Sequence, residues 1–528
     1  MNALQDPKIE GVAISAPGGK TLLRLLTCGS VDDGKSTLIG RMLYECGAVF
    51  DDKLGALDRD SKKFGTQGDS LDFALLVDGL AAEREQGITI DVAYRYFGSA
   101  RRKFIVADTP GHEQYTRNMA TGASTADLAI LLVDARKGLL TQTRRHAFIA
   151  SLLRVRHIVL AVNKMDLVGY DQTIFEDITQ SFQTLAQGLG FASITPIPVS
   201  ARDGDNIVAR STHMGWYAGP VLLEHLETVQ VGPQAREGQG FALPVQWVNR
   251  PDLDFRGYAG TIAAGSIRVG DRVRILPNGQ SSEVARLVTH DGDLQLAAQG
   301  QAVTLTLASE VDISRGDVIV SGATSARQGL ELSAHVVWTS ETPLRLDNRY
   351  VIKLATGQAN ADVVALHRVI DINSFEARAV SEVPLNGVAL VTLRVDRPIV
   401  FDDYARNRVL GGFILIDRLS NETAAIGLVN SDALADLARA SGWAEQVERR
   451  VIGHIGVAGS QARRRFLRSL VADLLVAVLL AGALGFWAGS LPVGLVLFLA
   501  DLIIRSLVRA LCRRWFRPSE GVSDGGGI

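Results

Sequence analysis

The sequence predicts an α/β P-loop domain followed by two β-barrel domains and an apolar helical C-terminal segment. Three observations predict this architecture. A glycine-rich loop near the N-terminus lies between an apolar run and a helix-like segment. After about residue 240, the alternation of strands and helices gives way to short strands separated by turns. Residues 466–516 are strongly apolar, as helices in or on a membrane are.

The glycine-rich loop at residues 29–36 reads GSVDDGKS, which is a complete phosphate-binding loop. It follows the apolar run Leu22–Leu26 and precedes the helix-like segment Thr37–Tyr44, which is the context that the motif needs. Loop N–H groups and the helix N-terminus then face phosphate oxygens. Lys35 can reach the β- and γ-phosphates, and the Ser36 hydroxyl can ligate Mg²⁺. The predicted phosphate-site residues are Gly29, Ser30, Val31, Asp32, Asp33, Gly34, Lys35, Ser36 and Thr37.

A second motif, DTPGH at residues 108–112, follows the apolar strand Phe104–Ala107. Open parallel sheets bind their ligands at strand C-termini, so we expect this motif to face the phosphates. Asp108 can hold Mg²⁺ through water, and the Gly111 N–H can contact the γ-phosphate.

A third motif, NKMD at residues 163–166, follows the strand His157–Val162. The Asp166 carboxylate can accept from two adjacent N–H donors on a guanine edge. Adenine does not offer that pair, so the motif favours GTP over ATP. A further backbone contact to the guanine oxygen is expected after the strand Ile197–Val199. The predicted guanine-site residues are Asn163, Lys164, Asp166, Ser200 and Ala201.

The segment Glu83–Asp91 lies between the P-loop and Asp108. We predict that Thr89 belongs to switch I, which a γ-phosphate and its Mg²⁺ would order. A solvated helix end is the alternative for the charged run Glu83–Glu85. The predicted metal ligands are Ser36 and Thr89 directly and Asp108 through water.

The order of these motifs resembles the translation-factor class of GTPases, in which a His follows the Asp-Thr-Pro-Gly run. More narrowly, about Leu22 to Val429 resembles the large, GTP-binding subunit of sulfate adenylyltransferase, known as CysN, and its nodulation relative NodQ. Two matching stretches lie outside the GTP site, so nucleotide binding alone does not explain them. The matching stretches are Leu26–Arg41, Leu75–Leu80, Phe104–Asn118, Val245–Pro251 and Asp254–Gly257.

The resemblance implies that adenosine 5′-phosphosulfate and pyrophosphate are formed from ATP and sulfate, driven by GTP hydrolysis. Adenylyl transfer then belongs to a separate, CysD-like small subunit in a heterodimer. GTP and Mg²⁺ are the expected cofactors. By resemblance, His112 would orient the attacking water. The other expected catalytic residues are Lys35, which with Mg²⁺ would stabilise charge on the transferring phosphate, and Thr89, a direct metal ligand in the GTP state. Asp32 stands where this GTPase class can bind a monovalent cation, and a loop-capping role is an equal alternative.

Domain boundaries follow from composition and turn chemistry. Apolar strands alternate with helical segments such as Thr116–Ser124, Gln142–Leu153 and Thr173–Leu189, which indicates an α/β domain. A GTPase domain and two barrels make up the translation-factor layout. The predicted parts are an N-terminal extension (1–21), a GTP-binding domain (22–229), a linker (230–240), β-barrel domain 2 (241–326), β-barrel domain 3 (332–430), a helical linker (431–465), the apolar segment (466–516) and a flexible tail (517–528).

The overall composition restricts the partners and the compartment. With a formal net charge of −2, the chain has no strong basic field, so no nucleic-acid partner is expected. Residues 1–10 contain no apolar h-region, which argues against secretion. Cys28, Cys46 and Cys512 offer neither a disulfide framework nor zinc spacing and fit a reducing cytoplasm.

The apolar segment 466–516 contains two hydrophobic runs flanked by arginines. Leu470–Gly489 is close to transmembrane length although it contains Asp473, whereas Leu491–Ile504 is too short to span upright. Basic flanks tend to stay cytoplasmic, so we predict a helical hairpin in or on the membrane, on its cytoplasmic side. A buried apolar helical pair, or a docking surface for the partner, is the alternative.

Three functional interpretations remain open at this stage. The first is the GTP-hydrolysing subunit of a sulfate-activating complex. The second is an elongation-type GTPase that delivers a tRNA, against which stand Asp33 and Ser36, where elongation factor Tu typically has His and Thr. The third is a membrane scaffold that kept a GTP site, and binding of GTP without turnover would favour it.

Overall fold

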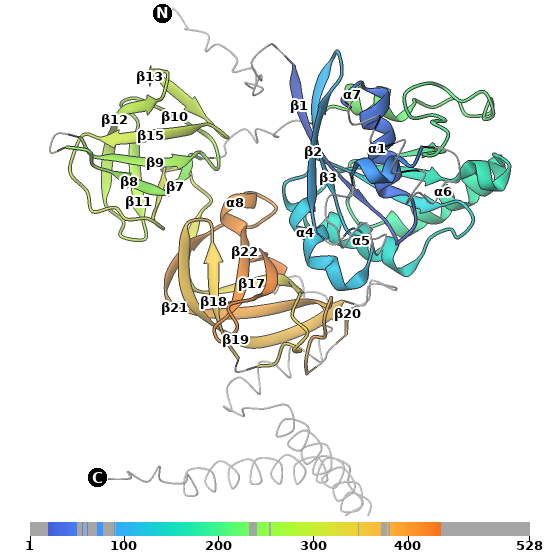
Figure 1. Cartoon of the computed structure of the whole chain (residues 1–528). Helices are drawn as coiled ribbons and strands as arrows, with labels where there is room; N and C mark the ends of the chain where they lie inside the picture. The colour runs from blue at the N-terminus through green and yellow to red at the C-terminus, as the bar shows by residue number, and fades with distance from the viewer. Residues whose placement is uncertain are drawn as a thin grey trace, which may run out of the picture. The chain divides into compact units, whose positions relative to one another are not determined.

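A computed structural model of the chain describes residues 20–49, 55, 57, 61, 71–77, 89, 91–231, 240–252, 255–346, 348–370, 377–378 and 381–433 (Figure 1). The predicted membrane hairpin at 466–516 and the tail at 517–528 lie outside the described residues. So do most of the predicted segments 1–21, 230–240 and 431–465, and residues 83–88 of the switch segment.

The GTP-binding domain is built on a six-stranded sheet in the order β2-β3-β1-β4-β5-β6. All neighbours are parallel except β2 and β3, which are antiparallel. The strands are β1 (Thr21–Cys28), β2 (Ala93–Gly98), β3 (Arg102–Asp108), β4 (Leu128–Asp134), β5 (His157–Asn163) and β6 (Ser193–Pro198). The helices are α1 (Lys35–Glu45), η1 (Phe73–Leu76), η2 (Glu113–Tyr115), α4 (Thr116–Ser124), α5 (Thr141–Leu152), η3 (Met165–Val168), α6 (Gln172–Ala186) and α7 (Leu222–Thr228).

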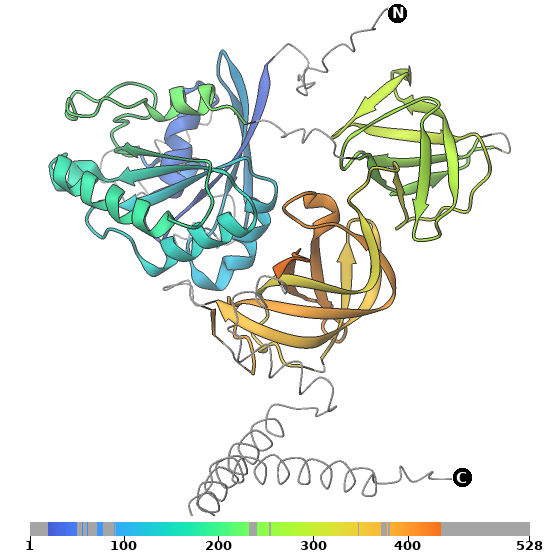
Figure 2. The same cartoon turned by 180° about the vertical axis from the view of Figure 1, so that it is seen from behind.

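Helices cover both faces of this sheet (Figures 1 and 2). One core joins α1 and α7 to the sheet, and the other joins α4, α5 and α6 to its opposite face. Every residue of the central strand β4 is buried, so its sequence LAILLVD is apolar up to the final Asp134. The sheet therefore presents its polar residues at the strand ends.

Two element boundaries differ from the sequence prediction for local reasons. Helix α6 ends at Ala186, before Leu189, because Gly188 and Gly190 follow with positive φ. Strand β6 spans Ser193–Pro198, whereas the predicted strand was Ile197–Val199. It contains two prolines, which are tolerated because β6 is an edge strand of the sheet.

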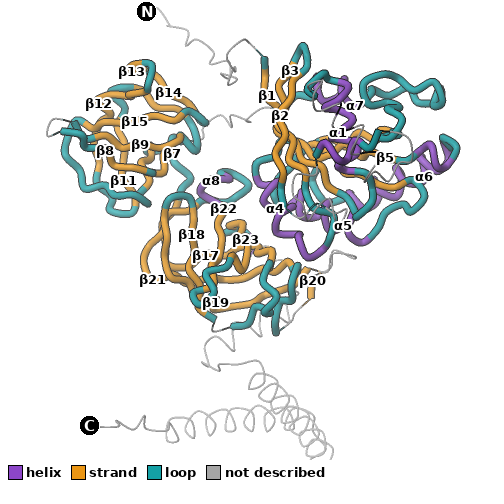
Figure 3. The backbone as a smooth tube through the Cα atoms, in the orientation of Figure 1, coloured by secondary structure: helices purple, strands orange, loops and turns teal. Residues whose placement is uncertain are grey.

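Domain 2 follows as a β-barrel whose main sheet has the order β7-β16-β11-β12-β15-β9-β8, with β13 beside β12 and a separate β10-β14 pair (Figure 3). A single apolar cluster fills it, built around Phe241, Tyr258 and Ile275. Its strands are β7 (Ala242–Pro244), β8 (Trp247–Asn249), β9 (Gly257–Thr261), β10 (Ser266–Arg268), β11 (Arg272–Leu276), β12 (Ser281–Thr289), β13 (Gly292–Leu294), β14 (Leu296–Ala298), β15 (Ala302–Leu307) and β16 (Val318–Val320).

Domain 3 is a second barrel of order β18-β22-β23-β17-β21-β19-β20, which an additional β18–β19 pairing closes. Trp338 and Tyr350 pack edge to face in its core at a ring separation of 5.7 Å. Its elements are β17 (Arg327–Trp338), β18 (Arg349–Leu354), β19 (Gly357–Ile370), β20 (Ala377–Arg378), β21 (Val388–Phe401), α8 (Arg408–Gly411), β22 (Gly412–Asp417) and β23 (Thr423–Val429). The GTP-binding domain and two barrels confirm the predicted translation-factor layout.

Domain 3 packs against helices α4 and α5 of the GTP-binding domain. Phe148 of α5 forms an apolar cluster with Val337 and Val388 of domain 3. The Tyr404 hydroxyl donates to the Leu153 carbonyl at 3.4 Å. Within the part of the chain that the structure describes, no helix combines the length and apolarity needed to cross a membrane.

Candidate functional site

The candidate site lies at the C-terminal ends of the parallel strands. Register places Thr27 of β1 beside Asp108 of β3, and Asp134 of β4 beside Asn163 of β5. Strand β1 leads into the P-loop between the two halves of the sheet, and at that point open α/β sheets bind ligands. Residues from four loops therefore meet at one edge.

Contacts within the P-loop, and one close approach of Asn163, shape the loop. The Ser30 N–H donates to Asp33 Oδ2 at 2.6 Å, so the Asp33 carboxylate is turned into the protein and is buried. Gly34 adopts φ 91° at the N-cap of α1, and a Cβ there would lie 2.5 Å from Asn163 Nδ2. Of the other predicted loop residues, Val31 and Thr37 are half-buried and Asp32 is exposed.

The Lys35 side chain is folded back against the P-loop backbone. Its Nζ donates to the Ser30 carbonyl at 2.8 Å, and the residue is only 7% exposed. Burial lowers the pKa of Lys35, and the nearby Asp108 carboxylate opposes that shift. Gly111 passes so close that a Cβ would lie 2.5 Å from the Lys35 Nζ. The Lys35 side chain is thus buried, and the space beside its Nζ at Gly111 is too small for a side chain.

Three oxygen-bearing side chains converge beside Lys35, as the sequence predicted for a metal site. The Ser36 hydroxyl lies 3.4 Å from the Thr89 hydroxyl and donates to Asp108 Oδ2 at 3.1 Å. Burial raises the pKa of Asp108, while Lys35 and a hydrogen bond from Thr27 lower it. Two hydroxyls and one carboxylate are the hard oxygen donors that Mg²⁺ prefers, so this set fits the ion.

The predicted base-site residues also come together. Asn163 bridges two loops, because its Nδ2 donates to the Asp33 carbonyl at 2.7 Å and its Oδ1 accepts from the Ala201 N–H at 2.9 Å. The Ser200 hydroxyl donates to Asp166 Oδ1 at 2.9 Å. Lys164, at φ 64°, lies over the loop and donates to the Asp32 carbonyl. These contacts fix the Asp166 carboxylate beside the P-loop.

His112 lies at the N-cap of η2 and is half-buried. Its Nδ1 accepts from the Gln114 N–H at 3.3 Å, which assigns that nitrogen to the local turn. The other ring nitrogen, Nε2, is then the one that can contact a water. Gly111, beside Lys35, connects His112 directly to the phosphate end of the site.

Sequence reasoning missed the residues that support the site from behind. Asp134 is fully buried and pairs with Lys164 at 3.1 Å and with Arg136 at 2.7 Å. Burial raises its pKa, but these hydrogen bonds outweigh that effect and hold the pKa below its usual range. Its position after an apolar strand, like that of Asp108, was the available signal.

Helix α5 supplies a second missed support. The Gly29 N–H donates to His146 Nδ1 at 3.0 Å, and the Ser30 hydroxyl lies 3.3 Å from that of Thr143. Burial, with Lys35 and Arg145 nearby, lowers the pKa of His146 to about 3, so the ring is neutral and can accept. A single histidine in the mixed sequence of α5 gives no sequence signal of such a contact.

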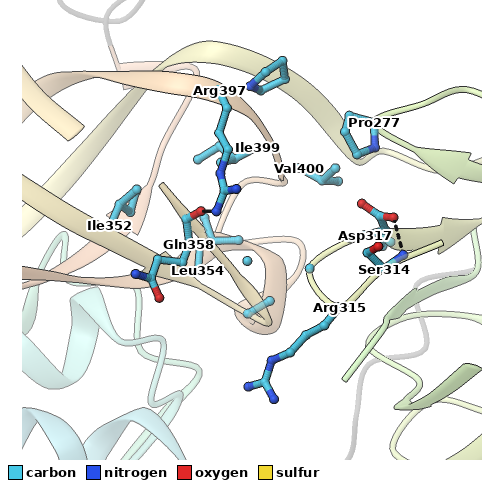
Figure 4. Close-up of a pocket in the computed structure, with 15 residues that line it drawn as sticks. Pro277, Ser314, Arg315, Asp317, Ile352, Leu354, Gln358, Arg397, Ile399 and Val400 are labelled. Carbon is cyan, nitrogen blue, oxygen red and sulfur yellow. Dashed lines mark hydrogen bonds between the residues drawn. The ribbon is translucent and has the colours of Figure 1, made fainter. Parts of the chain in front are cut away.

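A separate cavity of about 320 Å³ lies between domains 2 and 3 (Figure 4). Arg397 donates to the Gln358 carbonyl there, and Asp317 accepts from the Ser314 N–H at 2.8 Å. None of the predicted GTP-site residues lines it. The cavity therefore plays no part in the nucleotide site.

Comparison with protein families gives two matches. The family model described as the Elongation factor Tu GTP binding domain matches residues 20–231. The model described as the GTP-eEF1A C-terminal domain-like family matches residues 331–430, which is domain 3.

Curated relatives extend the match across both barrels. Sulfate adenylyltransferase subunit 1 of Erwinia tasmaniensis is 55% identical over 423 residues, covering 80% of this chain and 89% of that protein. The subunit of the same name from Yersinia enterocolitica is 57% identical over 411 residues, covering 78% and 86%. The bifunctional enzyme NodQ of Rhizobium sp. (strain N33) is 57% identical over 416 residues, covering 79% of this chain and 64% of NodQ.

Proposed function

This chain belongs to the sulfate adenylyltransferase subunit 1 family, and from that premise we propose that it is the GTP-hydrolysing subunit of the enzyme. One observation carries the proposal. In a chain more than half identical to that subunit, the residues predicted to hold phosphate, metal and base lie together at the C-terminal ends of the strands. GTP hydrolysis then drives formation of adenosine 5′-phosphosulfate and pyrophosphate from ATP and sulfate.

Phosphoryl transfer needs positioning and neutralisation of charge more than covalent chemistry. The P-loop N–H groups and Lys35 would bind the phosphates, and arrival of the anion would return Lys35 to a fully compensated environment. Asp166, held by Ser200, would accept from the two adjacent N–H donors of guanine. Asn163 ties the base loop to the P-loop, so the two subsites keep a fixed separation.

Ser36, Thr89 and Asp108 would hold Mg²⁺, the first two directly and Asp108 through water. When bound, the ion neutralises charge that develops on the transferring phosphate. Thr89 of the predicted switch segment lies 3.4 Å from the Ser36 hydroxyl, so the two oxygens are close enough to share one ion.

His112 would orient the attacking water from Nε2, since Nδ1 is engaged with Gln114. The oxygen of that water forms a bond to the γ-phosphorus, the bond to the β-phosphate oxygen breaks, and GDP and phosphate result. In the sulfate reaction, a sulfate oxygen attacks the α-phosphorus of ATP and pyrophosphate leaves.

We assign adenylyl transfer to a separate small subunit of the CysD type. In the described residues one candidate nucleotide site is found, and its proposed base contact, Asp166, suits guanine and not adenine. The name "subunit 1" of the relatives implies such a partner. The membrane hairpin at 466–516 stays a proposal, and equal partitioning of the full chain and a chain ending near Ser460 into the soluble fraction would contradict it.

The proposal is tested by measuring GTP hydrolysis by the full chain purified with a sulfate adenylyltransferase small subunit. We expect hydrolysis to rise when ATP and sulfate are both supplied, and not when either is supplied alone. GTP binding without turnover under every condition would instead favour a scaffold that kept its GTP site.

A further inference from the structure

Glu113 directly follows His112, and two elements outside its own segment hold it. Arg145 of α5 donates from Nη1 to Glu113 Oε2 at 3.1 Å. Asn386 of domain 3 donates from Nδ2 to the main-chain carbonyl of Glu113 at 2.8 Å. One residue is thus held through its side chain by the GTP-binding domain and through its backbone by domain 3.

Asn386 is itself fixed in the turn before β21. It adopts φ 62°, a conformation that Asn tolerates better than most residues, and it is only 8% exposed. Its own N–H donates to the Trp338 carbonyl at 2.8 Å, which ties the turn to the barrel core. The Asn386 side chain that contacts Glu113 is therefore held rigidly to the core of domain 3 and moves with that domain.

Arg145 is equally well fixed on the other side. Its side chain is 12% exposed, and Nη1 also donates to Gln142 Oε1 at 2.6 Å, one turn earlier on α5. The same helix presents Thr143 and His146 to the first residues of the P-loop. The N-terminal half of α5 therefore makes short polar contacts with both the P-loop and Glu113.

We propose that Arg145 and Asn386 are positioning residues for GTP hydrolysis, which fix Glu113 and so the backbone that carries His112. The inference rests on the proposed role of His112 in orienting water. A shift of domain 3 against α5 breaks the Asn386 contact and releases this backbone, so docking of domain 3 and hydrolysis are coupled. Catalysis is sensitive to such small displacements, because a reacting group must be held close to its productive geometry.

Stability alone does not explain the arrangement. The Glu113 side chain is 64% exposed, and ion pairs at such positions contribute little to folding. Loss of the Arg145 pair should therefore change the rate of hydrolysis more than the folded fraction or the affinity for GTP.

The test is single-turnover GTP hydrolysis by the full chain with its small subunit. We compare Asn386→Asp, which keeps the shape but removes the donor, and Arg145→Met, each alone and combined with His112→Ala. We expect each single change to slow hydrolysis about tenfold while GTP affinity changes less than about threefold. In the His112→Ala background neither change should slow hydrolysis further, because residues that act as a unit are not additive.

Control variants make the same two substitutions at exposed positions away from the site. Asn421→Asp changes another left-handed asparagine of domain 3, and Arg394→Met removes the ion pair with Glu331 at 2.8 Å. Both should hydrolyse GTP at the unaltered rate, and Arg145→Lys should recover part of the lost rate. This inference is overturned if His112→Ala lowers the rate but Asn386→Asp and Arg145→Met do not. It is also overturned if these two changes slow hydrolysis in the His112→Ala background as much as they do in the unaltered chain. If His112→Ala has no effect, the proposed role of His112 fails first.

Discussion

The GTP-binding domain and domain 2 place their charged residues in opposite ways. In the GTP-binding domain, Lys35, Asp108 and Asp134 are buried at the strand ends, at 7% exposure or less. In domain 2, Arg286 of β12 and Asp293 of β13 form an ion pair at 2.7 Å with both side chains largely in solvent. Removing the charged side chains of the GTP-binding domain from water costs free energy that the exposed pair of domain 2 does not cost.

Burying a charge removes it from water, and a protein keeps such a group only where other interactions compensate. In the GTP-binding domain the compensation comes partly from the attraction between Lys35 and Asp108, although burial lowers the pKa of Lys35 and raises that of Asp108. Phosphates and Mg²⁺ would complete it. The comparison teaches that in these two regions the buried charged groups lie at the candidate site, whereas the exposed ion pair lies away from it.

Among substitutions that compare buried with exposed charge, Lys35→Ala should have the largest effect on GTP hydrolysis. Lys35→Ala removes the buried cation, and we expect GTP hydrolysis to fall by at least about 100-fold, which is the usual effect of losing one stabilising donor. Lys103→Ala, an exposed lysine of the same domain, is the control and should hydrolyse GTP normally. Hydrolysis at the same rate in both variants would break the contrast.

The base site should give the next largest effect. Asp166→Asn replaces one acceptor oxygen by a donor, so GTP affinity should fall by roughly 100-fold, as expected for losing hydrogen bonds to a charged group. Xanthosine triphosphate, which offers an acceptor in place of one donor, should then bind better than GTP. Competition between the two nucleotides measures this, and an unchanged preference for GTP would remove Asp166 from the base site.

A smaller effect is expected from pH through His146. Burial lowers its pKa from 6.5 to about 3, so between these values the unfolded chain binds a proton that the folded chain does not. Folding stability from this group is therefore present above pH 6.5 and is lost as pH falls, by up to about 1.4 kcal/mol per pH unit.

This contribution is isolated by comparing the urea unfolding of the unaltered chain and of the His146→Asn variant. The two pH values, about 7.5 and about 5.5, lie on either side of the ordinary pKa of histidine. Asn can still accept from the Gly29 N–H but does not titrate. The variant should lose less stability on acidification than the unaltered chain. An equal loss in both proteins would show that His146 is protonated when folded.

The smallest effect is expected at the exposed pair of domain 2. Arg286→Met breaks the contact with Asp293, yet the urea midpoint and the rate of GTP hydrolysis should not change measurably, because solvent already screens both groups. A clear loss of stability would show that exposed charge is not neutral in this protein.

Much of the site was predictable from sequence because its signals are local. GSVDDGKS, DTPGH and NKMD each follow an apolar run, and strand C-termini meet in open parallel sheets. The turn of Asp33 into the protein was not predictable, because a carboxylate in a glycine loop suits solvent equally well. His146 and Asn386 were also missed, since each contacts a partner more than 100 residues away in the chain.

The central claim is that GTP hydrolysis at this strand-end site drives sulfate activation. The most direct test is adenosine 5′-phosphosulfate formation by the full chain with its small subunit, with GTP, without GTP and with the Lys35→Ala variant. Our account predicts that product formation needs both chains, that GTP raises it, and that Lys35→Ala abolishes the rise. GTP hydrolysis that no combination of ATP and sulfate couples to product formation would contradict it.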